Sequence, residues 1–237
     1  MTKHTVASVA TEIFDRVPGY ERTVVTCVVG RPDAVRMAGA VAMATPWATQ
    51  AVARTAEVDD VLAVPSIASW RRAFRAVGIN PAKYRPAVEA LLRRARGGSL
   101  PFLGRPLIDI GTAVSLATLS PVGVHTYDDL DGPVRLDIAK GTERFASLSG
   151  ERAVAEPGEV VFRCGGTVLT RRWAWRQGAV GSVREDSRLL AVNVDSLDGS
   201  ERERATELLV RALTALGATG LATHRLTPEA PEATLEW

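Results

Sequence analysis

The sequence predicts an α+β fold, because stretches typical of helices come first along the chain and stretches typical of strands follow them. Residues 34–56 are rich in alanine, and residues 65–78 and 86–98 repeat apolar residues at helical spacing. From residue 128 the pattern changes to short runs rich in β-branched residues, and residues 200–216 return to an amphipathic helical pattern. Segregated helices and strands favour an α+β fold over a doubly wound parallel sheet.

Residues 1–65 are expected to form a strand and a helical segment packed on the core. The run "RTVVTCVVG", residues 22–30, is β-branched and ends on glycine, which predicts a strand. Residues 34–56 predict one helix, or two if Pro46 interrupts it.

Two further helices are predicted, each beginning at a proline and ending at glycine. The first, "PSIASWRRAFRAVG", turns its arginines outward, away from an apolar face formed by Ile67, Trp70, Phe74 and Val77. The second, "PAVEALLRRARGG", begins at Pro86 and turns its leucines inward. The apolar stretch of residues 104–120 predicts a buried helix that ends before Pro121.

Five short runs after residue 128 predict strands. They are residues 133–139, 143–149, 158–164, 167–175 and 188–197. The last helix is expected to have Ser200 as its N-cap, and residues 226–237 are expected to be a loose C-terminal end.

The run "TRRWAWRQ", residues 170–177, places three arginines, two before and one after, on either side of two tryptophans. If it is a strand, Trp173 and Trp175 share one face, which is expected to pack in the core. Arg172, Ala174 and Arg176 then share the other face, which is expected to line a polar cleft.

Length and composition favour a chain that folds without disulfide bonds. Its 237 residues suffice for one large domain or two small ones. The two cysteines, Cys27 and Cys164, belong to no disulfide or zinc pattern, which fits a reducing cytoplasm. No stretch resembles a signal peptide or a membrane span, so we expect a soluble, unprocessed cytoplasmic protein without membrane contact.

The formal net charge of +2 conceals an uneven distribution of charge. Between Trp70 and Arg105 only Glu89 is acidic, whereas the basic residues are Arg71, Arg72, Arg75, Lys83, Arg85, Arg93, Arg94, Arg96 and Arg105. Taken singly, each of these features has a simple structural explanation: the charges lie on a solvated face, and the tryptophans of residues 170–177 pack in the core. The two together favour a phosphate-rich partner, because guanidinium groups pair with phosphates and rings stack on bases.

Several common catalytic motifs are absent from the sequence. No GxGxxG follows a strand, and GxxxxGK[ST], HExxH and GxSxG do not occur. This disfavours nucleotide hydrolysis, zinc proteolysis and α/β-hydrolase chemistry, and we expect neither a metal nor a cofactor. The remaining features are the basic helices, residues 170–177 and the segment "PVGVHTYDDLDG", residues 121–132, with His125.

Three stretches together resemble the stand-alone members of the B3/B4 domain family. They are "WRRAFRAVGINPAKYRPAVEALLRR", "LIDIGTAVSLATLSPVGVHTYDDLDGPVRLDIAKGTERF" and "GEVVFRCGGTVLTRRWAWRQ". This module also occurs in the β subunit of bacterial phenylalanyl-tRNA synthetase, where it hydrolyses the ester that joins a wrong amino acid to the tRNA. The resemblance implies a B3/B4-like domain over residues 66–225, with a central β-structure, surrounding helices and a cleft for the aminoacylated tRNA end.

The resemblance also implies candidate site residues. The motif "VHTYD" aligns His125 with an editing-pocket histidine, while Thr112 and Ala174 stand where the family usually has asparagine. These differences suggest an altered pocket, so the amino acid need not be tyrosine, which the synthetase module typically removes. Thr112 and Ser115, three residues apart on the buried helix, either bond backbone carbonyls or bound the amino-acid pocket together with Arg172, Ala174 and Arg176. The residues expected to bind tRNA are Arg71, Arg72, Arg75, Arg93, Arg94 and Arg96.

Hydrolysis of an aminoacyl ester makes modest demands, because the ester is already labile and needs mainly a positioned water. His125 can orient or partly deprotonate that water, and Asp128 or Glu143 can fix its tautomer. The Thr112 hydroxyl or a backbone amide can donate to the oxyanion. The alternatives are that His125 caps the turn after Pro121, that the aspartates bond local amides, and that Glu143 pairs with Lys140.

Three hypotheses therefore stand. The leading one is a free-standing deacylase that clears mischarged tRNA in trans. The second is a non-catalytic module that binds tRNA, RNA or an amino acid, and the third is a small-molecule protein that kept the cleft and lost the RNA surface. The third is favoured if the fold scatters the basic run away from His125.

Overall fold

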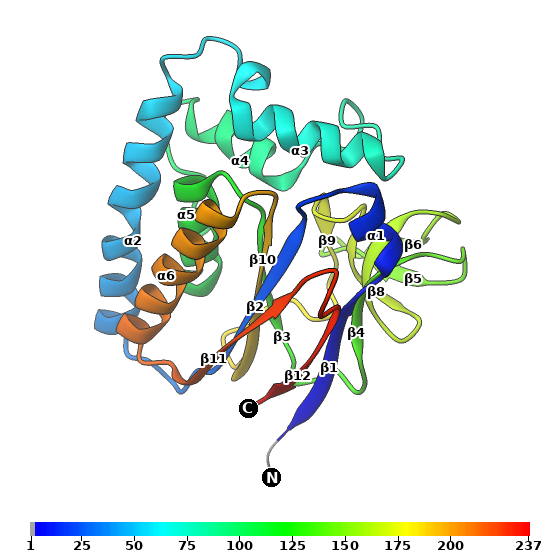
Figure 1. Cartoon of the computed structure of the whole chain (residues 1–237). Coiled ribbons are helices and arrows are strands. Elements are labelled where there is room, and N and C mark those ends of the chain that lie inside the picture. Colours follow the sequence, from blue (N-terminus) through cyan, green and yellow to red (C-terminus); the bar gives the residue numbers. More distant parts are fainter. Residues whose placement is uncertain (1–2) are drawn as a thin grey trace.

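A computed structural model describes residues 3–237, and the chain there forms helices and two β-sheets (Figure 1). The helices are α1 (Thr11–Arg16), α2 (Ala34–Thr55), the 3-10 helix η1 (Val61–Ala63), α3 (Pro65–Ala76), α4 (Ala87–Ala95), α5 (Pro106–Thr118) and α6 (Gly199–Leu216). The predicted α+β class is confirmed.

The four-stranded sheet is antiparallel throughout. Its order is β11 (Thr219–Leu226), β2 (Glu21–Val28), β10 (Leu189–Ser196) and β3 (Val122–Thr126).

The eight-stranded sheet is mixed, with parallel pairing between β1 and β4 and between β5 and β8. Its order is β12 (Glu232–Glu236), β1 (His4–Val9), β4 (Val134–Ile138), β7 (Val160–Cys164), β8 (Thr167–Arg171), β5 (Arg144–Ala146) and β6 (Arg152–Val154), and β9 (Arg176–Gln177) pairs with β8.

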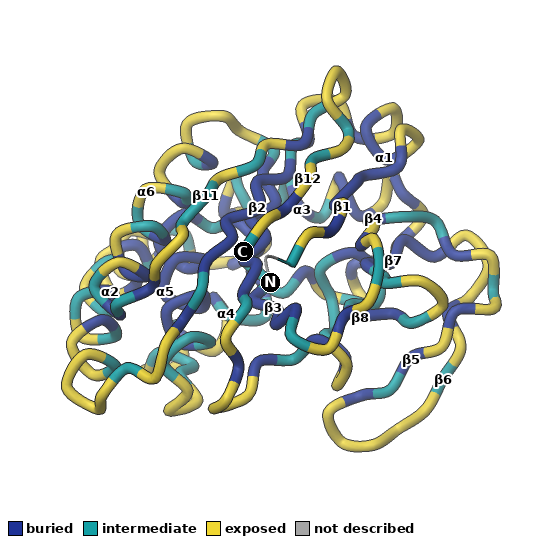
Figure 2. The backbone as a smooth tube through the Cα atoms, turned by 90° about the horizontal axis from the view of Figure 1, so that it is seen from below, coloured by how far each residue is buried: buried dark blue, intermediate teal, exposed yellow. Residues whose placement is uncertain are grey.

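The four-stranded sheet lies between a helical layer and the eight-stranded sheet. Helices α2, α5 and α6 cover one of its faces, where Val25 and Val192 join the same apolar core as Leu209 of α6 (Figure 1). Val24 and Ala191, at alternate positions, belong to the core shared with the other sheet. Buried positions concentrate where these layers meet, while the outer sides of α2 and α6 are exposed (Figure 2). The period of two therefore determines which side chains of this sheet face its neighbour.

Most predicted helices and strands are present, and α2 runs through Pro46 as one helix. The N-cap of α6 is Asp198, whose carboxylate accepts from the amides of Ser200 and Glu201, so the expected cap at Ser200 is wrong by two residues. Within residues 3–237, no helix combines the length and apolar composition that a bilayer crossing requires.

The C-terminal end is not loose, which corrects the prediction for residues 226–237. Strand β12 pairs antiparallel with β1, and Leu235 is fully buried. The Trp237 indole donates to the Leu190 carbonyl at 2.9 Å, and its ring lies 5.0 Å from that of Tyr127. Prolines and glutamates suggested a solvated tail, but the alternate apolar residues fill one face of a strand.

The run of residues 167–175 is also not one strand. Strand β8 ends at Arg171, and residues 172–175 turn the chain back into β9. Arg172 and Trp173 adopt left-handed backbone conformations, with φ of 48° and 65°. The two-residue alternation expected for this run fails because such conformations break the pleat.

Candidate functional site

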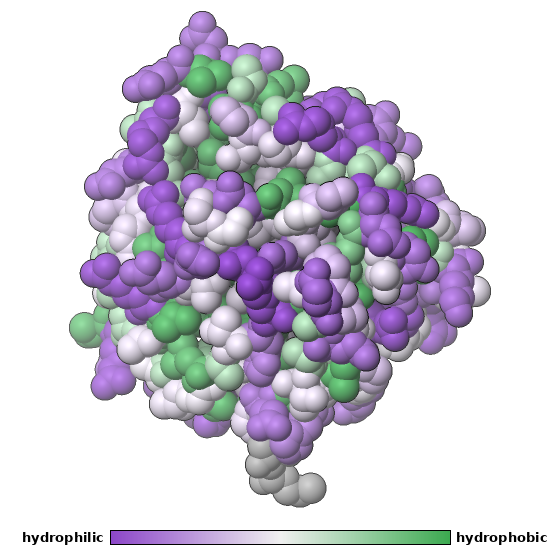
Figure 3. Space-filling model, in the orientation of Figure 1, coloured by the Kyte–Doolittle hydropathy of each residue, from purple (hydrophilic) through white to green (hydrophobic). Residues whose placement is uncertain are grey.

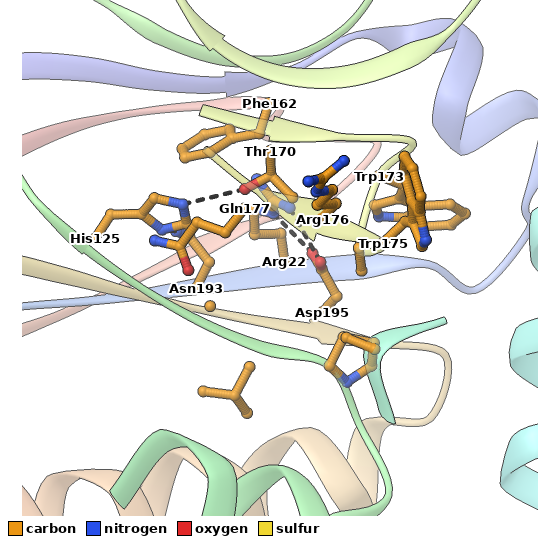
Figure 4. Close-up of a pocket in the computed structure, with 15 residues that line it drawn as sticks. Arg22, His125, Phe162, Thr170, Trp173, Trp175, Arg176, Gln177, Asn193 and Asp195 are labelled. Carbon is orange, nitrogen blue, oxygen red and sulfur yellow. Dashed lines mark hydrogen bonds and ion pairs between the residues drawn. The ribbon is translucent and has the colours of Figure 1, made fainter. Parts of the chain in front are cut away.

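A cavity lies between the two sheets (Figure 4). Its volume is about 90 Å³, several times the ~10–15 Å³ that one water needs. The four-stranded sheet lines it with Arg22, Gly123, His125, Asn193 and Asp195. The eight-stranded sheet and its turn line it with Phe162, Thr170, Ala174, Trp175, Arg176 and Gln177, and α4 adds Ala87.

His125 is the central polar ring of this cavity. It lies on β3 and points toward the eight-stranded sheet, so it does not cap a turn after Pro121. Its Nδ1 is 3.2 Å from the Asn193 amide nitrogen, and its Nε2 is 3.2 Å from the Thr170 hydroxyl. Because an amide nitrogen only donates, Nδ1 accepts, and Nε2 carries the proton and donates to Thr170.

Gly123 makes room for the imidazole. A Cβ at this position would lie 3.2 Å from Cε1 of His125, which is closer than ordinary van der Waals contact. Gly123 and His125 are two residues apart on one strand and therefore share the face that lines the cavity.

Burial makes His125 a neutral ring at physiological pH. The side chain is 3% exposed, and desolvation, reinforced by the nearby Arg22 charge, lowers its pKa to about 3. The neutral imidazole acts here as a fixed dipole between Asn193 and Thr170.

Arg22 and Asp195 form a buried ion pair beside His125. Strand register places them opposite each other on β2 and β10. Arg22 donates from Nε to one Asp195 oxygen at 2.7 Å and from Nη2 to the other at 3.0 Å, and the Tyr20 hydroxyl donates to the same carboxylate at 2.6 Å. This bidentate arrangement holds the guanidinium in one orientation.

The turn of residues 172–175 forms another wall of the cavity. Trp173 is buried among aromatic rings, 4.9 Å from Tyr20 and 5.7 Å from Phe74, and both Trp173 and Trp175 line the cavity. Glu159 holds the start of the turn: it accepts two bonds from the Arg171 guanidinium, at 2.9 and 2.6 Å, and one from the Arg172 amide. These contacts offset the cost of the left-handed backbone.

Three of the residues expected at the site meet at this cavity: His125, Ala174 and Arg176. Arg172 does not line it. Its guanidinium lies over the Tyr84 ring, 3.7 Å from the centroid, and bonds Glu156 at 2.7 Å. The expected assignment of Arg172 to the cleft is corrected, because the turn rotates it away.

Asp128 and Glu143 do not contact His125, which corrects their expected role in fixing its tautomer. Asp128 accepts from the amides of Arg188 and Leu189 at 2.8 and 3.0 Å, and Glu143 accepts from the amides of residues 140–142. Burial alone would raise the pKa of both carboxyls, but these donors hold each pKa below its usual value. Both carboxylates order local backbone.

Thr112 and Ser115 lie on α5, outside the cavity lining. Ser115 donates to the Ser120 carbonyl at 2.6 Å, which is the first of the two alternatives for this residue. This contact helps to end α5 before β3.

Sequence reasoning missed Arg22, Asn193 and Asp195. A signal was available for Asn193, a polar residue within the apolar run of β10, whereas Arg22 and Asp195 lie near strand ends beside other polar residues. All three are on the alternation that faces the second sheet. Thr170, at the end of β8, had no such distinguishing context.

Two of the six arginines expected to bind tRNA are engaged inside the protein. Arg71 donates to Glu89 at 2.7 Å and to the Pro81 carbonyl at 3.1 Å. Arg96 donates to the carbonyls of Thr55 and Val58. Both therefore tie α3 and α4 to their surroundings, which corrects their assignment to the RNA surface.

The other four, Arg72, Arg75, Arg93 and Arg94, are exposed on α3 and α4, as are Lys83 and Arg85 between these helices. Strongly hydrophilic side chains gather over the end of α3 and the turn after it (Figure 3). This surface adjoins the cavity: the Ala87 amide donates to the Ala174 carbonyl at 2.7 Å, and the Tyr84 ring lies 4.7 Å from that of Trp175. The fold therefore keeps the basic run next to the His125 cavity.

No group of three or more histidine, cysteine, aspartate or glutamate side chains suited to a metal ion occurs in residues 3–237.

Comparison with known proteins gives a family match and similarity to solved structures. The family model for the B3/4 domain matches residues 69–213. The solved structure of an N-terminal fragment of the phenylalanyl-tRNA synthetase β-subunit from Pyrococcus horikoshii is similar with a TM-score of 0.49 and 13% sequence identity. The match covers 90% of this chain and 49% of the length of that fragment. No curated protein matches the sequence.

Proposed function

The chain belongs to the B3/4 domain family, and on this premise we propose that the cavity between the two sheets receives the aminoacylated 3′ end of a tRNA. The protein then hydrolyses the ester of a mischarged tRNA in trans. One observation carries this proposal: His125 of β3 lines one cavity together with Ala174 and Arg176 of the turn before β9, and the exposed basic surface of α3 and α4 lies at its edge.

The surroundings of the cavity suit both parts of such a substrate. Arg176, Trp175 and Tyr84 combine a cation with flat rings, which suits the phosphate and base of a terminal nucleotide. Phe162 and Trp173 supply apolar walls for an amino-acid side chain. Ala174 widens the cavity where a larger polar residue would fill it.

The polar chain through His125 orients hydrogen-bond donors. Asn193 donates to His125, and His125 donates to the Thr170 oxygen, so the Thr170 hydroxyl hydrogen is free to donate onward. A water or substrate oxygen that accepts it is held in one place. Because an aminoacyl ester is labile, positioning of this kind is sufficient for hydrolysis without a strong general base.

The test is hydrolysis of a panel of mischarged tRNAs by the wild-type chain and by His125→Ala. We expect at least one aminoacyl-tRNA to be turned over, with a loss of tenfold or more in the variant. His4→Ala is the matched control, because His4 is a largely exposed histidine of β1, and it is expected to retain full activity. Unfolding curves of both variants show whether a loss of activity reflects a loss of fold.

A non-catalytic binding module is the second candidate, and one observation favours it. Both ring nitrogens of His125 are engaged and its pKa is lowered to about 3, which weakens it as a base. In that case the panel gives no turnover, while charged tRNA binds more tightly than uncharged tRNA.

Arg72, Arg75, Arg93 and Arg94 are the proposed tRNA-binding residues. The division into residues 1–65, 66–225 and 226–237 stays a prediction. Strand β2, from the first of these segments, supplies Arg22 to the cavity wall, so we expect the site to require that segment.

A further inference from the structure

Arg22 has a side-chain nitrogen that the protein leaves unpaired. Its Nε and Nη2 bond Asp195, but Nη1 is buried and contacts no acceptor within residues 3–237. The residue is 4% exposed and lines the cavity, where it lies between His125 and Asp195 (Figure 4).

The guanidinium is held rigidly and stays charged. Asp195 accepts two hydrogen bonds from one side of the guanidinium, and the Phe162 ring centroid lies 4.9 Å from Cζ of Arg22. Burial alone would favour loss of the proton, but the adjacent carboxylate outweighs it and the pKa is raised. The site therefore presents a fixed cationic donor and needs no rearrangement to use it.

An unpaired charged donor in a low-dielectric site is costly, and a ligand that supplies an acceptor removes that cost. The carboxylate in the cavity wall, Asp195, already accepts three hydrogen bonds. Two donors in the cavity lining, Arg22 Nη1 and Trp173 Nε1, are buried without an acceptor in residues 3–237, and Arg22 is the charged one. The Thr170 hydroxyl hydrogen is a further donor, and the amide oxygens of Asn193 and Gln177 are acceptors that can meet the amino group of a ligand. The cavity is therefore complementary to a ligand that brings an oxygen acceptor together with a small apolar part.

We propose that Arg22 Nη1 binds the carbonyl or carboxylate oxygen of the amino-acid unit that occupies this cavity. This inference rests on the proposed function, which identifies the ligand as an amino-acid unit. It adds the residue that binds the carbonyl group of that unit. Two sources share this chemistry. In an aminoacyl ester the acceptor is the carbonyl oxygen, whose negative charge grows during attack by water. In a free amino acid it is the α-carboxylate.

The test uses the full chain and two sets of probes. The first set is amides of 3′-amino-3′-deoxyadenosine with a panel of L-amino acids, which resist hydrolysis and keep the carbonyl. The second set is the corresponding free amino acids. Calorimetry measures the affinity of the wild type and of Arg22→Lys, which keeps a cation for Asp195 but lacks the second nitrogen. Arg202→Lys is the matched control, because Arg202 pairs with Glu21 outside the cavity.

We expect Arg22→Lys to bind the preferred probe at least tenfold more weakly and Arg202→Lys to remain within twofold of the wild type. Nitrogen-15 spectra of the guanidinium groups provide a second readout. This readout uses the wild-type protein only, so it does not depend on whether a variant folds. In these spectra the bound probe is expected to shift the Arg22 signals.

The inference is overturned if neither probe set binds, if the affinity of Arg22→Lys stays within twofold, or if the Arg22 signals do not move. Its failure is distinguishable from failure of the proposed function. If Arg22→Lys still deacylates tRNA at the wild-type rate, the role of Arg22 is contradicted and the proposed function stands. If free amino acids bind in an Arg22-dependent way but no charged tRNA is turned over, the deacylase function is contradicted and the role of Arg22 stands.

Discussion

The Asn193 amide nitrogen lies 3.2 Å from Nδ1 of His125, and this contact determines the tautomer of the buried imidazole. The register of β3 and β10 creates it: Asn193 is opposite Gly123, so its side chain reaches the ring across the space that the missing Cβ leaves. A neutral, oriented ring follows from backbone pairing together with one glycine.

The first prediction concerns stability in mild acid. Folded His125 has a pKa lowered to about 3, whereas an unfolded histidine titrates near pH ~6.5. Between these values the unfolded chain binds one more proton, so acidification lowers the free energy of unfolding by up to about 1.4 kcal/mol per pH unit. Urea unfolding between pH 6.5 and 5, above the range in which most carboxyls titrate, is expected to show this slope, and His125→Gln is expected to reduce it.

The control for this measurement is His4→Gln, which removes a largely exposed histidine outside the cavity. His224, whose pKa is also lowered by burial, contributes the same background to each variant. Equal slopes for the wild type and His125→Gln contradict a neutral buried ring.

The second prediction is that Asn193→Asp raises the pKa of His125. A carboxylate next to Nδ1 favours the charged ring, whereas the amide favours the neutral one. In proton NMR titrations from pH 5 to 8, the wild-type His125 ring is expected to show no transition and the variant to show one. Asn193→Leu, which removes the donor without adding a charge, separates the effect of charge from that of packing and is expected to show no transition.

Much of the fold follows from local patterns that are visible in the sequence. Pro65 and Gly78 mark the limits of α3, and the β-branched run of β2 is readable by itself. The turn at Arg172 and Trp173 is not readable in this way, because neither residue type favours a left-handed backbone. Tertiary contacts with Glu159 impose it.

The site was predictable only in part, for a related reason. The quoted motifs point to His125, but Arg22 and Asp195 are 173 residues apart and meet through strand register alone. Asp128, in contrast, follows His125 closely in sequence and turns its carboxylate toward backbone amides. Sequence proximity therefore suggested the wrong partner for the histidine.

The third prediction concerns the space above Gly123. Gly123→Ala places a methyl group 3.2 Å from Cε1 of His125, so the ring must move away from Asn193 or Thr170. We expect a tenfold or larger loss of deacylation with cooperative unfolding retained. Gly39→Ala is the control, because nothing lies within 4 Å of a Cβ there and the site is in α2, where alanine adds about 0.5–1 kcal/mol of stability. Unchanged activity in Gly123→Ala contradicts the proposed role of the ring orientation.

The fourth prediction is that Asp195→Asn lowers the free energy of unfolding by about 3–5 kcal/mol, because it leaves the Arg22 charge buried without its partner. The double variant Arg22→Met/Asp195→Leu removes both charges and is expected to regain much of this loss. Chemical denaturation of Arg22→Met, Asp195→Leu and the double variant gives the coupling energy. Losses that simply add contradict a mutual buried pair.

The last prediction concerns the RNA surface. Arg75 and Arg94 are exposed on α3 and α4 and make no ion pair in the described part of the chain, so their guanidinium groups are free for phosphates. Arg75→Glu/Arg94→Glu is expected to weaken tRNA binding at least tenfold and to reduce the salt dependence by roughly one unit of slope for each lost phosphate contact. The matched variant Arg36→Glu/Arg211→Glu makes the same change of net charge near the start of α2 and the end of α6, the ends of these helices that lie away from α3 (Figure 1). Filter binding over a range of salt concentrations distinguishes the two surfaces. Equal effects of the two pairs mean that tRNA senses only net charge, whereas a selective effect of the first pair supports an RNA path along α3 and α4 to the His125 cavity.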